Sequence, residues 1–136
     1  MDARRWGWAM ALVALACAPP DDRSEPELIR EGRTYTAWLY DSEYDKLWNR
    51  FSPEMRQTFG TVADLASFAG RAIKNLGAER GQVDERVNDA APYKVYSRSA
   101  SFDRSQHRML IEWSLARDGA VTGLVVRPLV ADSARH

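Results

Sequence analysis

The chain has few of the side chains that most often carry chemistry in proteins. Cys17 is its only cysteine, and His107 is its only histidine apart from the C-terminal His136. A single internal histidine with no thiol partner argues against a metal site. We therefore predict no metal ligand, and we place His107 at the rim of a hairpin.

The chain also lacks net charge, because 19 lysine and arginine residues balance 19 aspartate and glutamate residues. The basic residues form no stripe, which argues against a nucleic-acid partner, and the acidic residues form no run typical of a disordered tail. Five tryptophans and five tyrosines in 136 residues favour one packed domain with an aromatic-rich core or pocket.

Signatures of several enzyme classes are absent as well. The sequence contains no Gly-x-Ser-x-Gly elbow, no phosphate-binding loop and no dinucleotide glycine pattern. The alternating acids Asp41, Glu43 and Asp45 lack the glycine and the distal glutamate of a calcium loop, so helix capping explains them better. We predict no cofactor and no catalytic residue.

Residues 1–16 are typical of an export signal. Two arginines precede an uncharged, mainly apolar run over residues 6–16, which is too short to span a bilayer. The motif Ala14-Leu15-Ala16-Cys17 resembles a bacterial lipobox, in which the cysteine is acylated and becomes the mature N-terminus. We expect Cys17 to anchor the protein to a membrane of the cell envelope. The alternative is ordinary secretion after cleavage at the same bond, which gives a soluble periplasmic or secreted protein.

The rest of the chain divides into an exposed tether over residues 17–26, a folded domain over 27–130 and a tail over 131–136. Within the domain, apolar side chains recur at helical spacing and capping residues mark the helix ends. The predicted helices cover residues 27–40, 44–51, 53–59 and 62–76. We expect caps at Asp41 and Ser42, at Ser52 and at Thr61, while Gly32 weakens the first helix.

Three strands are predicted over residues 93–102, 107–115 and 121–128, joined by two hairpins. The Asp118-Gly119 pair predicts a two-residue turn with positive φ at both residues, which pairs Arg117 with Ala120 and Leu115 with Thr122. Continued along the strands, this register pairs Trp113 with Leu124. A four-residue tip over 103–106 pairs Tyr96 with Trp113 and Arg98 with Ile111.

One face of this predicted sheet is a core face, because side chains alternate along a strand. It collects Tyr96, Ala100, Phe102, Met109, Ile111, Trp113, Leu115, Leu124 and Val126, and no acid. A further strand is expected over residues 81–88, with Val83 and Val87 inward and Glu85 outward. Helices that precede an antiparallel sheet predict an α+β domain whose helices cover one sheet face. Trp113 is expected to meet the helical stripe that contains Trp48.

Three phrases carry a resemblance to a known superfamily. They are the stretch from Leu47 to Arg56, the segment Ile111-Glu112-Trp113, and the Asp118-Gly119 turn followed by Gly123-Leu124. Over residues 27–129 the chain resembles the nuclear transport factor 2-like superfamily, which has the cone fold. It is most similar to a bacterial domain that occurs alone in exported proteins or ahead of α/β-hydrolase domains. The resemblance implies a curved sheet that wraps helices around a pocket, but no catalytic motif of the superfamily's enzymes matches here.

Arg98 is the most suggestive single residue, because the register places its charge on the core face. A charge there must be paired or must bind something. It either takes an anionic ligand, reaches water at the rim, or pairs with a helix acid such as Glu43 or Asp45.

We expect a non-catalytic domain that binds a small apolar or amphipathic ligand, or an envelope protein. The predicted pocket residues are Tyr96, Arg98, Trp113, Trp48 and Leu124. One alternative is a small isomerase- or dehydratase-like enzyme. Another is a structural homodimer joined through an outer sheet patch of Val95, Leu110 and Val125.

Overall fold

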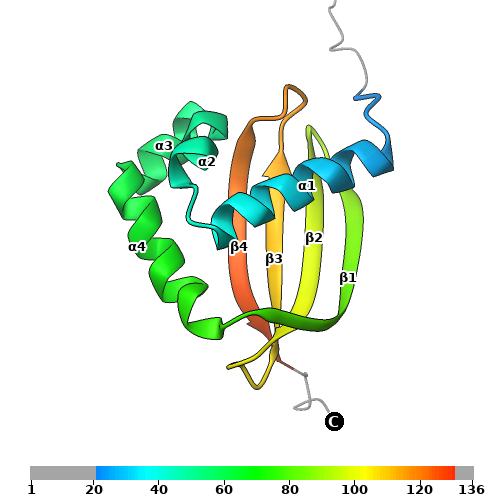
Figure 1. Cartoon of the computed structure of the whole chain (residues 1–136). Coiled ribbons are helices and arrows are strands. Elements are labelled where there is room, and N and C mark those ends of the chain that lie inside the picture. The colour runs from blue at the N-terminus through cyan, green and yellow to red at the C-terminus, as the bar shows by residue number, and fades with distance from the viewer. Residues whose placement is uncertain (1–20, 131–136) are drawn as a thin grey trace, which may run out of the picture.

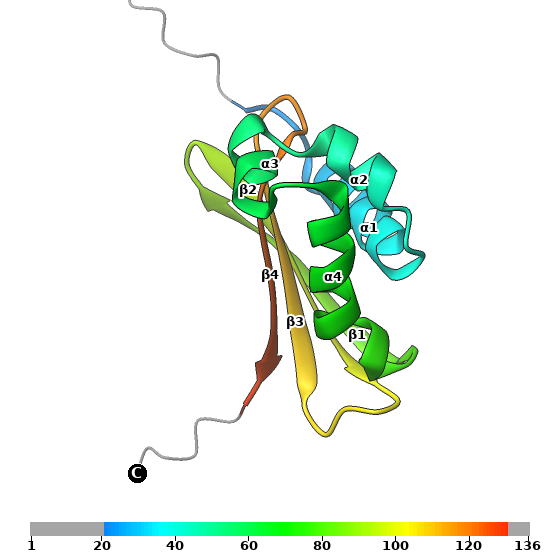
Figure 2. The same cartoon turned by 90° about the vertical axis from the view of Figure 1, so that its left-hand side faces the viewer.

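The computed structural model describes residues 21–130 (Figure 1). The elements in chain order are α1 (Glu25–Tyr40), α2 (Tyr44–Arg50), α3 (Pro53–Phe59), α4 (Val62–Ala72), a short 3₁₀ helix (Lys74–Leu76), β1 (Glu79–Ala90), β2 (Tyr93–Phe102), β3 (Arg108–Leu115) and β4 (Val121–Leu129). The strands form one antiparallel sheet in the order β1-β2-β3-β4, and the helices lie on one face of it (Figure 2). The predicted α+β class is confirmed. The predicted signal, Cys17 and the C-terminal tail lie outside the described residues.

The helix starts follow local capping chemistry. The Ser24 hydroxyl accepts from the Glu27 amide and the Glu27 carboxylate accepts from the Ser24 amide, so α1 begins at Glu25, two residues earlier than predicted. Ser52 caps α3, and Thr61 caps α4, as predicted. The expected cap of α2 is wrong. Asp41 instead ends α1, and Ser42, at φ 63°, contacts Lys74 with its hydroxyl.

The predicted registers hold at the centre of the sheet. Tyr96 pairs with Trp113, which in turn pairs with Leu124, and Arg98 pairs with Ile111. The pairings predicted next to the β3–β4 turn are wrong, because the loop has three residues, 117–119, instead of two. Ala116 donates to the Ala120 carbonyl (2.8 Å) and accepts from Gly119 (2.9 Å).

A bulge in β4 corrects the offset that the longer loop introduces. Of the two central turn residues, Gly119 alone has positive φ (88°), as in a three-residue hairpin loop that ends on glycine. Leu115 then pairs with Val121, and the register returns at the Ser114–Gly123 pair, which leaves Thr122 as the extra residue.

The first strand is longer than predicted, and one of its side chains points the other way. β1 covers Glu79–Ala90 and shows partial burial at Val83, Glu85 and Val87. The prediction that Glu85 faces outward is wrong, because residues two apart in a strand share a face. The core face therefore does contain acids, Glu85 and also Glu79.

The core lies between α1, the other helices and the inner sheet face. Tyr96 and Trp113 are fully buried at its centre. The Trp113 ring lies 5.8 Å from the Tyr35 ring of α1, and its indole N–H donates to the Thr36 hydroxyl (2.9 Å). Trp48, from the helical stripe expected opposite Trp113, lies against Phe51 (ring centroids 5.8 Å) and packs against the same core.

Candidate functional site

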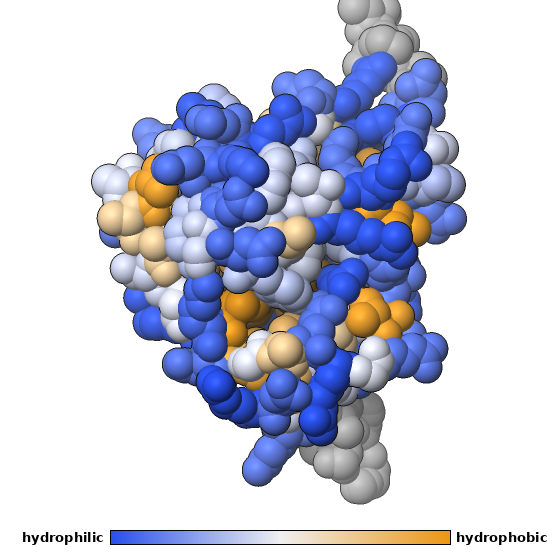
Figure 3. Space-filling model, in the orientation of Figure 1, coloured by the Kyte–Doolittle hydropathy of each residue, from blue (hydrophilic) through white to orange (hydrophobic). Residues whose placement is uncertain are grey.

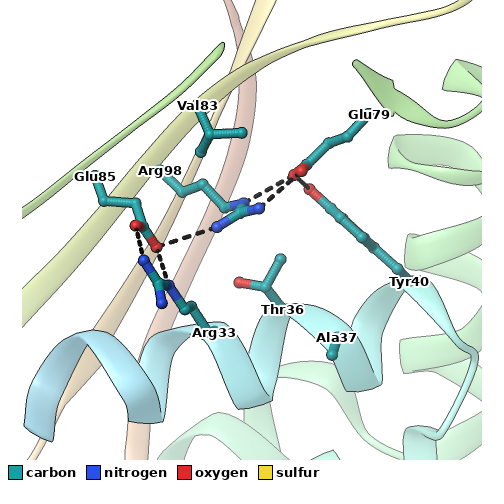
Figure 4. Close-up of a pocket in the computed structure, with 8 residues that line it drawn as sticks. All are labelled: Arg33, Thr36, Ala37, Tyr40, Glu79, Val83, Glu85 and Arg98. Atoms are coloured by element: carbon teal, nitrogen blue, oxygen red, sulfur yellow. Dashed lines mark hydrogen bonds and ion pairs between the residues drawn. The ribbon is translucent and has the colours of Figure 1, made fainter. Parts of the chain in front are cut away.

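A pocket of about 470 Å³ lies between α1, β1 and β2 (Figure 4). Its volume is in the range of small-molecule sites. The lining residues are Arg33, Thr36, Ala37, Tyr40, Glu79, Val83, Glu85 and Arg98. The four from α1 are spaced i, i+3, i+4 and i+7, so they share one helix face. The face of the molecule that carries α1 is mostly hydrophilic, with small separate hydrophobic patches (Figure 3).

Arg98 lies at the centre of a polar network in this pocket. Its guanidinium donates to both carboxylate oxygens of Glu79, at 2.8 and 2.7 Å, and to Glu85 at 3.1 Å. These side chains are 14–18% exposed, so water screens their interactions little. The predicted helix partners Glu43 and Asp45 are wrong, because the acids that neutralise Arg98 come from β1.

Two tyrosines and a second arginine extend the network to the helix. Arg33 donates twice to Glu85, at 2.8 and 2.6 Å, and the Tyr96 hydroxyl donates to the same carboxylate at 2.5 Å. The Tyr40 hydroxyl donates to Glu79 at 2.6 Å. The network therefore joins α1 to β1 and β2 across the pocket.

The network shifts the pKa values of its carboxyl and phenol groups away from neutral pH. Hydrogen bonds from Arg33 lower the pKa of Glu85 to about 2, and those from Tyr96 add to the effect. Burial opposes ionisation of Glu79, but hydrogen bonds from Arg98 and Tyr40 outweigh it and lower its pKa. Burial and the hydrogen bond to Glu85 raise the pKa of Tyr96 to about 12. Burial likewise raises the pKa of Tyr40. These four groups are thus poorly matched to proton transfer near neutral pH.

The structure separates the residues that the sequence predicted for one pocket. Arg98 lines it, whereas the buried Tyr96 is not a lining residue and joins the network through its hydroxyl. Trp113 is a core residue that touches the pocket through Thr36. Trp48 and Leu124 are half-buried at the edge of the core, and neither is among the residues that line this pocket.

Sequence reasoning missed Arg33, Tyr40, Glu79 and Glu85. Strand alternation from Val83 and Val87 was the signal that could have placed Glu85 inward. Arg33 and Tyr40 lie on the polar face of a helix whose other face is apolar. This position is a weaker signal for a site, because the polar face of such a helix is usually solvated.

A second hollow, of about 600 Å³, follows the N-terminal half of α1. There the Tyr35 hydroxyl donates to the Gly119 carbonyl (2.8 Å) and accepts from Arg50 (3.0 Å). Arg23 pairs with Glu31 at 3.3 Å. The Tyr35 hydrogen bond to Gly119 holds α1 against the β3–β4 turn, which is a structural role.

The remaining features considered in the sequence are a histidine, a metal site, an apolar patch on the outer sheet face and a membrane-spanning helix. His107 is exposed in the loop just before β3, and within residues 21–130 no group of three His, Cys, Asp or Glu side chains could hold a metal ion. On the outer sheet face Val125 is exposed, whereas Val95 and Leu110 are half-buried. None of the helices between residues 21 and 130 is both long and apolar enough to cross a membrane.

The role of this protein has to be inferred from the geometry of the pocket, because comparison with known proteins gives no relative. No protein-family model, curated protein sequence or solved structure matches this chain.

Proposed function

We infer that this protein binds a small, uncharged amphipathic molecule in the pocket between α1, β1 and β2, without converting it. The observation that carries this inference is the complete pairing of the pocket's charges. Arg33 and Arg98 face Glu79 and Glu85 at hydrogen-bond distance, so the four charges sum to zero inside the pocket.

The remaining hydrogen-bonding capacity in the pocket consists mainly of donors. Arg98 uses four of the five N–H donors of its guanidinium on Glu79 (two), Glu85 and the Tyr96 hydroxyl. Arg33 donates to Glu85 only through Nε and Nη2, so its other N–H groups suit a neutral acceptor such as a carbonyl or hydroxyl oxygen. Val83 and Ala37 supply apolar surface in the same pocket.

An anionic ligand fits this pocket less well than Arg98 alone would suggest. Glu79 and Glu85 already neutralise the guanidinium, and each would repel a second carboxylate or a phosphate. The pKa shifts of these two acids and of Tyr40 and Tyr96 favour binding over turnover, because general acid–base catalysis needs a group that titrates near the working pH.

Two fluorescent probes test the proposal on the full chain: neutral N-phenyl-1-naphthylamine and anionic 1-anilinonaphthalene-8-sulfonate. We expect the neutral probe to bind with enhanced emission. Ala37→Trp should fill the pocket from its exposed helix face and weaken that binding about tenfold or more. Val125→Trp, at an exposed position on the other sheet face, is the matched control and should bind like the wild type.

The apolar residues 6–16 are present in every variant, so the difference between variants isolates the pocket. Equal binding of the neutral probe by the wild type and Ala37→Trp would show that the pocket does not hold it. Tighter binding of the anionic probe, lost in Ala37→Trp, would replace the uncharged ligand class with an anionic one.

The cellular setting and the family are part of the same proposal and rest on the sequence. The lipobox-like motif supports an envelope protein anchored through Cys17, with secretion in soluble form as the alternative. Helices packed on one face of a curved antiparallel sheet, with a pocket between them, support membership of the nuclear transport factor 2-like superfamily.

A further inference from the structure

The two edges of the sheet differ in how they are covered. At the β4 edge, Phe51 forms a parallel bridge with Val121, and the Ser52 amide donates to the Val121 carbonyl (2.9 Å). Pro128 further along β4 cannot donate to another strand. No segment within residues 21–130 pairs with the free edge of β1, the edge that faces away from β2 (Figure 1). The unpaired N–H and C=O groups along this edge of β1 are therefore a template for another strand.

The residues of β1 are arranged symmetrically about Glu85. On the helix side of the sheet, Val83 and Val87 each lie two residues from it in sequence, with Val83 at the end of the irregular stretch between Arg80 and Asp84. On the outer side, Asp84 precedes it and Arg86 follows it, with opposite charges. A strand with this pattern is complementary to a second copy of itself running antiparallel, because a two-fold axis exchanges the two flanks.

We propose that two copies of this protein pair antiparallel along β1, with the two-fold axis at Glu85, into one continuous sheet. Residues directly opposite in an antiparallel pair share a sheet face. Asp84 then lies opposite Arg86 of the partner, and Val83 lies opposite Val87 of the partner. The two-fold axis repeats each of these pairs.

The charges select this register over its neighbours. A shift of the axis to Arg86 places the two Arg86 side chains opposite each other, and a shift to Asp84 does the same for the two acids. Like charges directly opposite are destabilising. The two Glu85 carboxylates at the axis do not carry the same cost, because each already accepts from Arg33 and Arg98 of its own chain.

The side chains that the pairing needs are accessible. The Asp84 side chain is 65% exposed and makes one contact, at 3.2 Å, with Arg108. Arg86 is exposed and has no side-chain partner among residues 21–130. Arg33, 60% exposed above Glu85, is placed beside the axis on the helix side.

Charge reversal tests the register. Asp84→Arg places arginine opposite Arg86 of the partner, and Arg86→Asp places aspartate opposite Asp84. We expect each variant alone to dimerise about tenfold more weakly than the wild type in sedimentation velocity of the full chain in dilute non-ionic detergent. An equimolar mixture of the two variants restores both ion pairs, so we expect heterodimers with wild-type affinity, captured through a tag on one variant.

Val125→Arg is the control, because it charges the outer sheet face and leaves the β1 edge unchanged. Loss of the dimer in this variant would assign the interface to the outer face. A wild-type chain that is monomeric at all accessible concentrations would overturn the proposal. So would single variants that dimerise like the wild type, or a mixture that forms no heterodimer. Heterodimer formation also shows that both variants are folded.

Discussion

The half-buried Arg98 shows how neighbouring residues determine what a charge can do. Arg98 is on the core face, as its register with Ile111 predicts. Alone, it would be a site for an anion. Glu79 and Glu85 surround it instead, so it organises a neutral polar wall. A residue's identity gives its charge, and its partners decide whether that charge is available to a ligand.

Glu85 predicts how the stability of the protein depends on pH. Its pKa falls from 4.5 to about 2 on folding, so its carboxylate stabilises the folded state above the unfolded pKa. This contribution is lost as the pH falls from 4.5 towards 2. We expect Glu85→Gln to be less stable than the wild type near neutral pH and to lose less stability over this acid range, as measured by urea unfolding.

Glu54→Gln, at an exposed position in α3, is the matched control for that measurement. It should follow the wild-type profile. If Glu85→Gln loses stability in acid as steeply as the wild type does, the ion pairs with Arg33 and Arg98 do not contribute to folding.

At the scale of elements, the closest approach between α1 and the sheet is at a glycine. In the sequence, Gly32 counts against a helix. In the structure, a Cβ at this position would lie 2.2 Å from the Tyr96 ring, so only glycine lets the helix pass over β2. The conformational cost of this glycine is offset by the burial of Tyr96, which is 0% exposed.

Gly32→Ala should therefore destabilise the fold by about 1–3 kcal/mol or more, the range for overpacked cores. Gly70→Ala in α4 is the comparison, because a Cβ there meets nothing within 4 Å. That change should raise the free energy of unfolding by about 0.5–1 kcal/mol through helix propensity. Urea unfolding of both variants measures the difference. Equal effects of the two changes would mean that α1 does not pack on Tyr96.

At the scale of the whole molecule, one buried hydrogen-bond chain connects the helical layer to the centre of the sheet. The Trp113 indole donates to the Thr36 hydroxyl (2.9 Å), which itself donates to the Gly32 carbonyl (2.8 Å). Thr36 also lines the pocket. Packing, helix position and pocket shape therefore depend on the same contact.

A double-mutant cycle on Trp113 and Thr36 measures this connection. Thr36→Val leaves the buried indole N–H without its acceptor, so we expect a loss of about 1–3 kcal/mol. In a Trp113→Phe background the same change should cost less, with a coupling energy above about 0.5 kcal/mol. Additive effects would show that the hydrogen bond does not join the layers.

Local chemistry determined much of this fold from the sequence alone. The caps at Ser52 and Thr61 depend on side chains within four residues of the amides that they bind. The inner face of β2 and β3 follows from alternation, which has a fixed period of two along a strand. The central register follows as well, since a one-residue slip would expose Trp113 to solvent.

Tertiary structure alone decided the pocket. Arg33 and Glu85 are 52 residues apart in the chain, and they meet only because α1 crosses the sheet at Gly32 and β1 pairs with β2. The bulge in β4 depends on the length of the β3–β4 loop, which turn residues specify incompletely. The charge of the pocket is a sum over four side chains from α1, β1 and β2, so no local pattern in the sequence contains it.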